Sequence, residues 1–362
     1  MKNLIFTVTT DLTYDQRMIR ICSSLAVNGY NITLVGRRMK SSIAITSMPF
    51  RQKRIGCLFQ EGILMYLEYN LRLLFFLLFQ KVDCICAIDL DTILACYFGS
   101  LLKKVTRVYD AHELFCEMKE IVNRPFVYGT WKKIEKFAVP KFKHGYTVNE
   151  AIADEFNKMY QVNYKVIRNI TVMEHLYIPV KTQKFILYQG SVNEGRSFET
   201  LIPAMKYINC PLIICGDGNF MTQARQLVRE CMLEEKIIFT GKLEPHLLKE
   251  YTYSAFIGTT IFENNGLNNY HSLANRFFDY LHAAVPQLCV GYPAYKEINN
   301  MYEVAVLTED LSPESLAYHC NRLLSDESLY VRLQQNCIKA REILNWQSEE
   351  RRLIDFYNEI LN

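Results

Sequence analysis

The sequence predicts a two-domain α/β protein in which each domain has a parallel β-sheet covered by helices. The chain has 362 residues, which is too long for one ordinary hydrophobic core. Strand-like and helix-like segments alternate through the first half, and the alternation begins again near residue 184. Hydrophobic residues make up 50% of the chain and charged residues 22%, a balance typical of globular proteins.

The first half supplies the elements of an N-terminal domain. The apolar run Leu4–Val8 is too short for a signal peptide, and we expect it to form the first strand. An amphipathic helix is predicted over Asp15–Asn28, with its end at Gly29. The other expected elements are strands at Asn31–Val35, Cys84–Ile88 and Arg107–Tyr109 and a helix that begins at Thr92.

The second half predicts a C-terminal domain of the same kind, in which each strand leads to a glycine. The expected strands are Phe185–Tyr188, Leu212–Cys215 and Ile237–Thr240, and the expected helices are Phe198–Tyr207, Met221–Cys231 and Gln347–Leu361. The predicted boundaries are 1–170 for an N-terminal Rossmann-like domain, 171–184 for a linker, 185–345 for a C-terminal Rossmann-like domain and 346–362 for a last helix. Ligands bind beyond the carboxyl ends of the strands in such sheets, so we expect a site in a cleft that the two domains face.

One apolar segment raises the question of membrane contact. Ile63–Phe79 is strongly apolar but shorter than the about 20 residues of a spanning helix. Arg51, Lys53 and Arg54 lie just before it, and basic residues beside an apolar helix can hold a protein on an anionic membrane face. The alternative is a core helix that follows a solvated basic loop, and the sequence favours neither interpretation.

Charge and cysteine content narrow the classes of function. The net charge of +3 gives no strong basic field, which argues against a nucleic-acid partner. The twelve cysteines show no zinc-site spacing, and the closest pair, Cys84 and Cys86, lies in an apolar run. We expect reduced, buried thiols in a cytoplasmic protein that is either soluble or peripheral on the inner face of the membrane.

The segment Tyr109–Glu113 places three ionisable side chains directly after a predicted strand. These are Asp110, His112 and Glu113. A histidine at a strand end can donate a hydrogen bond to a ligand hydroxyl or orient a leaving group. The alternative is a helix cap, in which Asp110 or Glu113 accepts from free amides and His112 lies on the surface.

Two glycine-containing loops follow strands of the C-terminal domain. In Gly190–Arg196, which includes Ser191 and Gly195, the glycines allow the backbone to approach a ligand. The helix that follows favours phosphate at its N-terminus, and Arg196 can clamp that phosphate. The loop Gly216–Gly218 repeats the arrangement without the third glycine of a dinucleotide fingerprint. For this second loop, tight turns are the better interpretation.

A third cluster, Ser272–Tyr280, contains a carboxylate that could bind a nucleotide. Asn275 or Ser272 is expected to cap a helix that carries Asp279, and a carboxylate can accept from both ribose hydroxyls. The alternative is an acid favoured by the helix dipole, worth under about 1 kcal/mol. Asp89 and Asp91 could instead hold a divalent metal, but we favour a loop-and-cap role for this pair and expect no metal.

These segments resemble family 4 glycosyltransferases, the retaining enzymes of GT-B architecture, over nearly the whole chain. The motifs are individually weak but occur in the family's order. They are Asp15–Arg17, Tyr109–Phe115, Val166–Asn169, Tyr188–Gly190 with Gly195 and Arg196, Ile214–Gly218, Phe239–Gly241, Asn275–Tyr280 with Pro286, and Trp346–Tyr357.

The resemblance implies a role for each segment. His112 would contact the donor sugar near the reacting carbon, Arg196 would bind the diphosphate and Asp279 the ribose. The other donor-side residues would be Gly190, Ser191, Gly195, Gly216, Gly218, Gly241, His271 and Asn275, and the acceptor-side residues would be Asp15, Arg17, Asp110 and Glu113. The N-terminal domain would be the acceptor side, and the last helix would cross back to it.

The reaction implied is hexosyl transfer to a glycan or lipid-linked acceptor in cell-surface polysaccharide biosynthesis. The donor would be a nucleotide-sugar, with UDP favoured and GDP as runner-up, and no cofactor would be needed. The sequence departs from the family at His271, where the family has an acid, at Ala274 in place of proline and at Ala284 in place of glycine. Two alternatives therefore stay open: a non-catalytic relative that binds nucleotide-sugar or a partner, and a nucleotide-sugar epimerase of the same architecture.

Overall fold

The computed structural model describes residues 1–13, 15–179 and 183–361, and it divides the chain into two compact units. The first unit is Met1–Asn169 together with Ser348–Asn362, and the second is Ile170–Gln347. The segment 171–184, which the sequence predicts to be a linker, falls in the second unit. There Thr171 accepts a hydrogen bond from the backbone of Trp346. Residues 180–182 of that predicted linker, and Asn362 at the end of the predicted last helix, lie outside the described residues.

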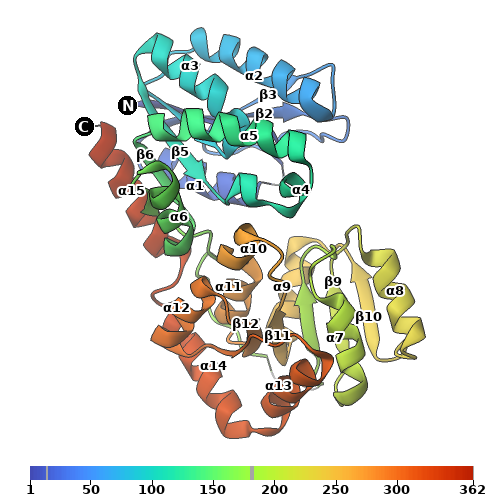
Figure 1. The fold of residues 1–362 in the computed structure, drawn as a ribbon. Coiled ribbons are helices and arrows are strands. Elements are labelled where there is room, and N and C mark those ends of the chain that lie inside the picture. The colour runs from blue at the N-terminus through green and yellow to red at the C-terminus, as the bar shows by residue number, and fades with distance from the viewer. Residues whose placement is uncertain (14, 180–182, 362) are drawn as a thin grey trace. The chain divides into compact units, whose positions relative to one another are not determined.

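The first unit is built on a seven-stranded sheet in which all neighbouring strands are parallel. From one edge to the other the strands are β3 (Arg51–Gly56), β2 (Asn31–Arg38), β1 (Asn3–Thr7), β4 (Cys84–Ile88), β5 (Thr106–Ala111), β6 (His144–Thr147) and β7 (Lys165–Val166). The order reverses beside β1, as in doubly wound nucleotide-binding sheets. Parallel neighbours require crossover connections, which the intervening helices supply (Figure 1).

Helices cover both faces of this sheet (Figure 1). They are α1 (Gln16–Val27), α2 (Gly62–Leu78), α3 (Ile93–Lys103), α4 (Lys119–Val122), α5 (Pro125–Ala138), α6 (Glu150–Tyr160) and α15 (Trp346–Leu361). Successive residues of a strand point to opposite faces, and Ile5 of β1 joins the core formed with α2 and α3. Its neighbour Phe6 packs on Tyr357 of α15, with ring centroids 5.9 Å apart. The end of the chain therefore belongs to the core of the first unit.

Strand β3 was not expected, because the sequence analysis places its basic residues either in a solvated loop or against an anionic membrane face. The strand pairs with β2 along its whole length, and Arg54 forms an ion pair with Asp11 at 2.8 Å. The Arg54 side chain is only 10% exposed, so the solvated-loop interpretation is wrong for this residue. A long-range partner 43 residues away in the chain decides its place.

The second unit has a six-stranded parallel sheet with the same kind of reversal beside β8. Its strands in order are β10 (Ile237–Gly241), β9 (Leu212–Cys215), β8 (Ile186–Gln189), β11 (Ile257–Thr260), β12 (Gln287–Val290) and β13 (Ala305–Thr308). Its helices are α7 (Phe198–Ala204), α8 (Met221–Glu230), α9 (Pro245–Ser254), α10 (Leu267–His271), α11 (Asn275–His282), α12 (Pro293–Tyr302), α13 (Pro313–Ser325) and α14 (Glu327–Arg341).

The predicted fold class of two Rossmann-like α/β domains is confirmed. The expected strands Cys84–Ile88 and Leu212–Cys215 have the predicted bounds, and the other predicted strands and helices differ by a few residues. All twelve cysteines are free thiols, ten of them buried. In the described part of the chain, no helix combines the length and the apolar character needed to span a bilayer.

Candidate functional site

In the first unit, His112 lies between two carboxylates at the carboxyl ends of neighbouring strands. It directly follows β5, and Asp89 directly follows β4. The His112 Nδ1 is 3.3 Å from Oδ2 of Asp89, and its Nε2 is 3.3 Å from Oδ2 of Asp110. The backbone N–H of His112 also donates to Oδ1 of Asp89 at 3.0 Å. The imidazole is therefore fixed on both sides, with 22% of its side chain still exposed.

These two carboxylates decide the charge of His112. Burial alone lowers the pKa of an imidazole, but the negative charges of Asp89 and Asp110 outweigh burial and raise the pKa of His112 to about 10. The side chain is thus a cation at neutral pH, with both ring nitrogens as donors. It places a positive charge at the edge of the sheet where the fold places ligands.

Arg17 of α1 also belongs to this charge network, because it pairs with Asp110. Its Nη2 lies 2.8 Å from Oδ1 of Asp110, and both side chains are buried. Burial raises the pKa of Asp110, but Arg17 and His112 lower it below its ordinary value overall. The predicted acceptor-side residue Asp15 accepts from the backbone of Met18 at 3.0 Å and so caps α1. Glu113 is half-buried beside His112.

The loop-and-cap interpretation of Asp89 and Asp91 is wrong for Asp89. This residue precedes a short 3-10 turn, Leu90–Thr92, but its side chain makes no cap hydrogen bond and binds His112 instead. Its backbone φ of +54° lies in the left-handed region, which is strained for a residue other than glycine. Asp91 accepts from Thr9, and burial together with the charge of Asp89 raises its pKa to about 7. Among the described residues, no group of three or more His, Cys, Asp or Glu is arranged to hold a metal ion.

In the second unit, two strand-end loops touch backbone to backbone. A Cβ added to Gly216 would lie 1.8 Å from the carbonyl oxygen of Gly190, and one added to Gly218 would lie 2.3 Å from that of Val192. The N–H of Gly190 donates to Cys215, and that of Gly216 donates to Gly241. Glycine is therefore required in the second loop by close approach, a stronger constraint than the tight turn expected from the sequence.

The loop after β8 carries the predicted diphosphate-binding residues. Gly195 has φ +79°, and a Cβ there would lie 2.5 Å from the Asn265 side chain. The Arg196 guanidinium lies 5.6 Å from the centre of the Phe262 ring and is half-buried. Ser191 is exposed, and its carbonyl oxygen accepts from Tyr188 at 2.7 Å. Helix α7 begins directly after this loop.

Asp279 is held by donors from two other segments. Its Oδ1 accepts from Thr171 at 2.7 Å and its Oδ2 from Gln189 at 2.9 Å. The amide of Gln189 is itself oriented, because Thr252 donates to its oxygen at 2.8 Å. A carboxylate has about four acceptor sites, and its two oxygens are both oriented here by these donors. The sequence analysis named Asp279 but not Thr171 or Gln189, whose relation to it depends on the fold.

The predicted caps of α11 are wrong. Ala274 occupies the cap position without a side-chain hydrogen bond, and its N–H donates to the hydroxyl of Tyr295 at 2.7 Å. Ser272 donates to Asn269 instead, and Asn275 is exposed as the first residue of the helix. His271, which stands where the resembling family has an acid, is the last residue of α10.

Arg276 is a functional candidate that the sequence analysis missed. The side chain is 8% exposed, and its Nη1 donates to the carbonyl oxygen of Gln189 at 3.2 Å. Its guanidinium lies 4.7 Å from the centre of the Tyr188 ring. Nε and Nη2 have no hydrogen-bond partner, and no carboxylate pairs with this cation in the described part of the chain. A Cβ at Gly190 would lie 3.1 Å from Nη1, so the uncompensated charge is directly beneath the glycine loop.

Comparison with known proteins gives a family match within the second unit and solved structures of the same fold. Residues 177–340 match the family model of glycosyl transferases group 1. No curated protein matches the sequence at a significant level. A sucrose-phosphate synthase from Thermosynechococcus elongatus superposes with a TM-score of 0.82 at 14% identity over 99% of both chains.

Two further solved structures have the same fold. HepE from Anabaena, in complex with UDP and glucose, superposes with a TM-score of 0.78 at 12% identity over 99% of this chain and 100% of that one. WaaG, a glycosyltransferase involved in lipopolysaccharide biosynthesis, superposes with a TM-score of 0.69 at 14% identity over 97% and 98% of the two chains. At these identities the likeness concerns the fold.

Proposed function

Because residues 177–340 match the family model of glycosyl transferases group 1, we propose that the protein moves a hexose from UDP-sugar to a glycan or lipid-linked acceptor in cell-surface polysaccharide biosynthesis. The observation that carries this proposal is the buried, uncompensated Arg276 beneath a glycine loop inside the matched family segment. A cation without a carboxylate partner is costly in a protein interior, and an anion bound at the loop would offset that cost.

We assign the donor diphosphate to the loop Gly190–Arg196 and to the facing loop Gly216–Gly218. In the proposed glycosyl transfer, the bond that breaks joins the anomeric carbon of the sugar to a phosphate oxygen. The new bond joins that carbon to an acceptor oxygen. Negative charge therefore develops on the departing diphosphate. Arg196 would contact it, and the fixed charge of Arg276 would act through the loop, so both favour departure of the nucleotide.

Asp279 and His112 receive the remaining donor roles. Thr171 and Gln189 hold the carboxylate of Asp279 in one orientation, which suits it to accept from ribose hydroxyls. His112, which lies between Asp89 and Asp110, would place its positive charge beside the donor sugar near the reacting carbon. We further propose that configuration is retained and that no metal takes part, as in the family that the motifs resemble, and that the protein acts at the inner face of a membrane.

The UDP complex of HepE supports UDP as the nucleotide, because that protein shares this fold over its whole length. The test is a thermal-shift series with UDP, UDP-glucose and GDP, with EDTA and then with magnesium. A ligand that binds only the folded state raises the melting temperature. We expect a shift with the UDP ligands in EDTA. Complete loss of binding and turnover in EDTA would contradict metal independence.

Variants separate binding from turnover. Arg196→Ala, Asp279→Ala and Arg276→Met should each weaken UDP binding by roughly 1–3 kcal/mol, the scale of a lost charge-assisted contact. His112→Ala should instead reduce UDP release from UDP-sugar much more than it reduces UDP affinity. Arg225→Ala, which removes a guanidinium stacked on Phe239 in the same unit, is the matched control and should change neither.

The outcome also decides between catalysis and binding alone. His271 stands where the resembling family has an acid, an observation that favours a non-catalytic relative as the second candidate. UDP binding without any UDP release from a range of UDP-sugars, with or without acceptor extract, would select that candidate. Absence of binding to every nucleotide would contradict both.

A further inference from the structure

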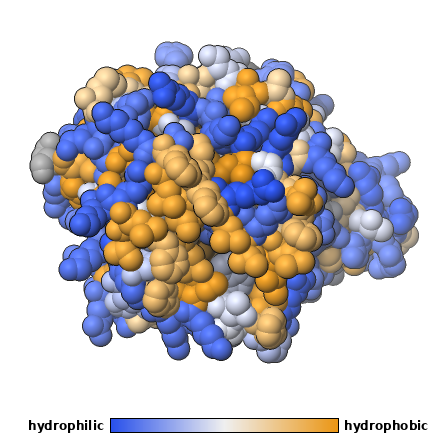
Figure 2. Space-filling view, turned by 90° about the horizontal axis from the view of Figure 1, so that it is seen from above, coloured by the Kyte–Doolittle hydropathy of each residue, from blue (hydrophilic) through white to orange (hydrophobic). Residues whose placement is uncertain are grey.

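A continuous apolar surface covers α2 and α3 in the first unit. We define this apolar face by exposed side chains of the two helices and the residue after α2: Ile63, Leu64, Leu67, Leu71, Phe75, Phe79, Phe98, Leu101 and Leu102. Figure 2, which views the molecule from the side on which α2 and α3 lie in Figure 1, shows apolar side chains gathered over this area. Soluble monomers rarely expose so many large apolar side chains together, and patches of this kind mark interaction sites.

Helix α2 is mostly apolar, with Glu68, Asn70 and Arg72 as its polar residues, and only one side of it is buried in the core. Met65, Tyr69, Leu73 and Leu77 are buried. On the outward side, Leu67, Leu71 and Phe75 recur every fourth residue and are 56%, 50% and 63% exposed. Spacing of four aligns them along one stripe of the helix. Burial in the core therefore accounts for the inner side of α2 and leaves the outer stripe exposed in the described part of this unit.

The two helices of the apolar face are linked at one end, where basic residues follow. Lys103 at the end of α3 donates to the carbonyl oxygen of Leu78 at the end of α2, at 3.0 Å, which ties the two helix ends together. Gly99 allows close packing, because a Cβ there would lie 3.2 Å from Leu77. Lys104 follows directly, so cations gather where both helices end.

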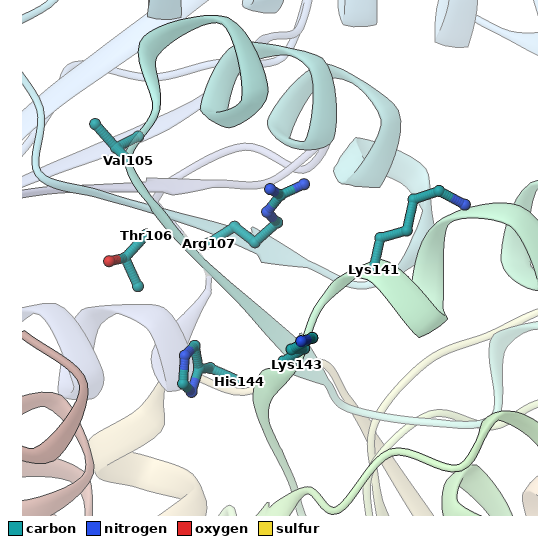
Figure 3. A pocket seen from close by; sticks show the side chains of 6 residues that line it. All are labelled: Val105, Thr106, Arg107, Lys141, Lys143 and His144. Atoms are coloured by element: carbon teal, nitrogen blue, oxygen red, sulfur yellow. The ribbon is translucent and has the colours of Figure 1, made fainter.

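Beside this end lies a cationic pocket of about 250 Å³. Figure 3 shows Arg107 at the start of β5, Lys141 on the segment before β6, and Lys143 and His144 where β6 begins. Among the described residues, no acidic side chain lines the pocket. It is lined by these four residues together with Val105 and Thr106.

Aromatic rings connect the pocket to the apolar face. Arg107 lies 5.1 Å from the centre of the Tyr97 ring, and Lys141 lies 3.8 Å from the centre of the Phe137 ring. Tyr97 contacts both Phe137 and Phe98, and Phe98 belongs to the apolar face. Cations that rest on aromatic rings beside an apolar surface match the boundary between lipid headgroups and acyl chains.

We propose that the apolar face and the pocket together dock the protein on an anionic lipid membrane. The helices would lie in the plane of the interface with Leu67, Leu71 and Phe75 among the acyl chains, and the pocket would take a phosphate headgroup. Helix α2, with 17 residues, is about 25 Å long. This inference rests on the proposed function in one respect, which is the lipid-linked acceptor. Docking would bring the enzyme to the membrane surface, where such an acceptor lies.

Charge complementarity favours the membrane over a second copy of this chain. The basic pocket needs an anionic partner, and the apolar face needs an apolar one. An anionic bilayer supplies both at adjacent depths, with phosphate at the surface and hydrocarbon beneath it. The basic residues identified from the sequence, Arg51, Lys53 and Arg54, are not part of this pocket, and Arg54 is already paired with Asp11.

The test is co-sedimentation of the full chain with vesicles of phosphatidylcholine alone and of phosphatidylcholine with phosphatidylglycerol. The wild type should bind the anionic vesicles, and salt should weaken the binding. Replacing Leu67, Leu71 and Phe75 together by serine should reduce binding at least tenfold. Lys141→Gln and Lys143→Gln should each reduce binding to anionic vesicles about fivefold, since a basic residue near such a surface contributes about 1 kcal/mol.

Controls come from the second unit. Met301, Val331 and Ile343 are exposed to a similar degree, and their triple serine variant should bind vesicles like the wild type. Lys206→Gln with Lys339→Gln is the matched control for charge. The UDP thermal shift is measured on every variant, so loss of vesicle binding with an unchanged UDP shift separates this inference from the proposed function.

Three results would overturn the inference. The first is a wild type that sediments with neither kind of vesicle. The second is a triple serine variant of the apolar face that binds as well as the wild type. The third is a wild-type dimer in light scattering that the same variant converts to a monomer without any change in vesicle binding, which would assign the face to a second copy.

Discussion

Asp89 and His112 bind each other through two contacts, the N–H of His112 to Oδ1 of Asp89 at 3.0 Å and the Nδ1 of His112 to Oδ2 at 3.3 Å. They are 23 residues apart in the chain and follow neighbouring strands. The positive φ of Asp89 is the local strain that accompanies this arrangement. Strain of this kind, of order 1–3 kcal/mol, is often found at functional sites.

The first prediction concerns the charge of His112. Asp89→Asn removes one of the two negative charges that raise the imidazole pKa, so the pKa of His112 should fall well below its value of about 10. Asparagine has nearly the same size and shape as aspartate, so the variant changes mainly the charge. NMR titration of the imidazole protons measures the change. Asp154→Asn, which changes an exposed acid on α6, should leave the pKa of His112 unchanged. An equal His112 pKa in the two variants would show that Asp89 does not raise the pKa of His112.

The second prediction is a pH dependence of stability. Because the folded-state pKa of His112 is raised to about 10 from an ordinary 6.5, the folded state binds the proton more tightly than the unfolded state. Its contribution is fully present below pH 6.5 and is lost as the pH rises through about 10. Urea unfolding should show that the wild type is more stable than His112→Gln below pH 6.5. This difference in the free energy of unfolding should decrease as the pH rises from 6.5 to about 10. His246→Gln, at an exposed position, should show no such trend.

The third prediction separates close approach from backbone strain in the glycine loops. Gly241 and Gly216 both have positive φ, but only Gly216 has a neighbour within reach of an added Cβ. Gly241→Ala should cost about 1–2 kcal/mol from its left-handed backbone alone. Gly216→Ala should cost more, because the 1.8 Å contact with Gly190 forces the two loops apart, and it should abolish the UDP thermal shift. If calorimetry gives the same loss of unfolding free energy for Gly216→Ala and Gly241→Ala, the two loops separate without cost.

The fourth prediction follows from Ala284, which stands where the resembling family has glycine. Its φ is +52°, so the side chain holds the backbone in a strained conformation. Ala284→Gly should raise the free energy of unfolding by up to about 1 kcal/mol, since an L-residue in this region costs roughly 1–2 kcal/mol and glycine loses part of that gain through chain entropy. Ala283→Gly, one residue earlier with φ −82°, should destabilise the protein. A destabilised Ala284→Gly variant would contradict this account.

Local sequence signals determined most of the fold. Alternating apolar segments with glycine at their ends predicted strands such as Cys84–Ile88 and Leu212–Cys215 within a residue, because burial on both faces gives a parallel strand a continuous apolar run. Strand β3 escaped prediction, since an edge strand with charged residues lacks that run. The motifs also identified His112, Asp110, Arg196 and Asp279 as candidates.

Tertiary structure decided how those candidates relate to one another. The sequence treated Asp89 as a helix cap, because an acid before a helix usually has that role, but β4 and β5 lie side by side and bring it to His112 instead. The sequence assigned no role to Arg276. The fold places its guanidinium beneath Gly190, where no carboxylate of the described residues pairs with it. Periodicity and turn residues act over a few positions and can be read from the chain. Ion pairs, close backbone approach and the exposed stripe of α2 depend on which distant segments meet, and only the folded chain determines that.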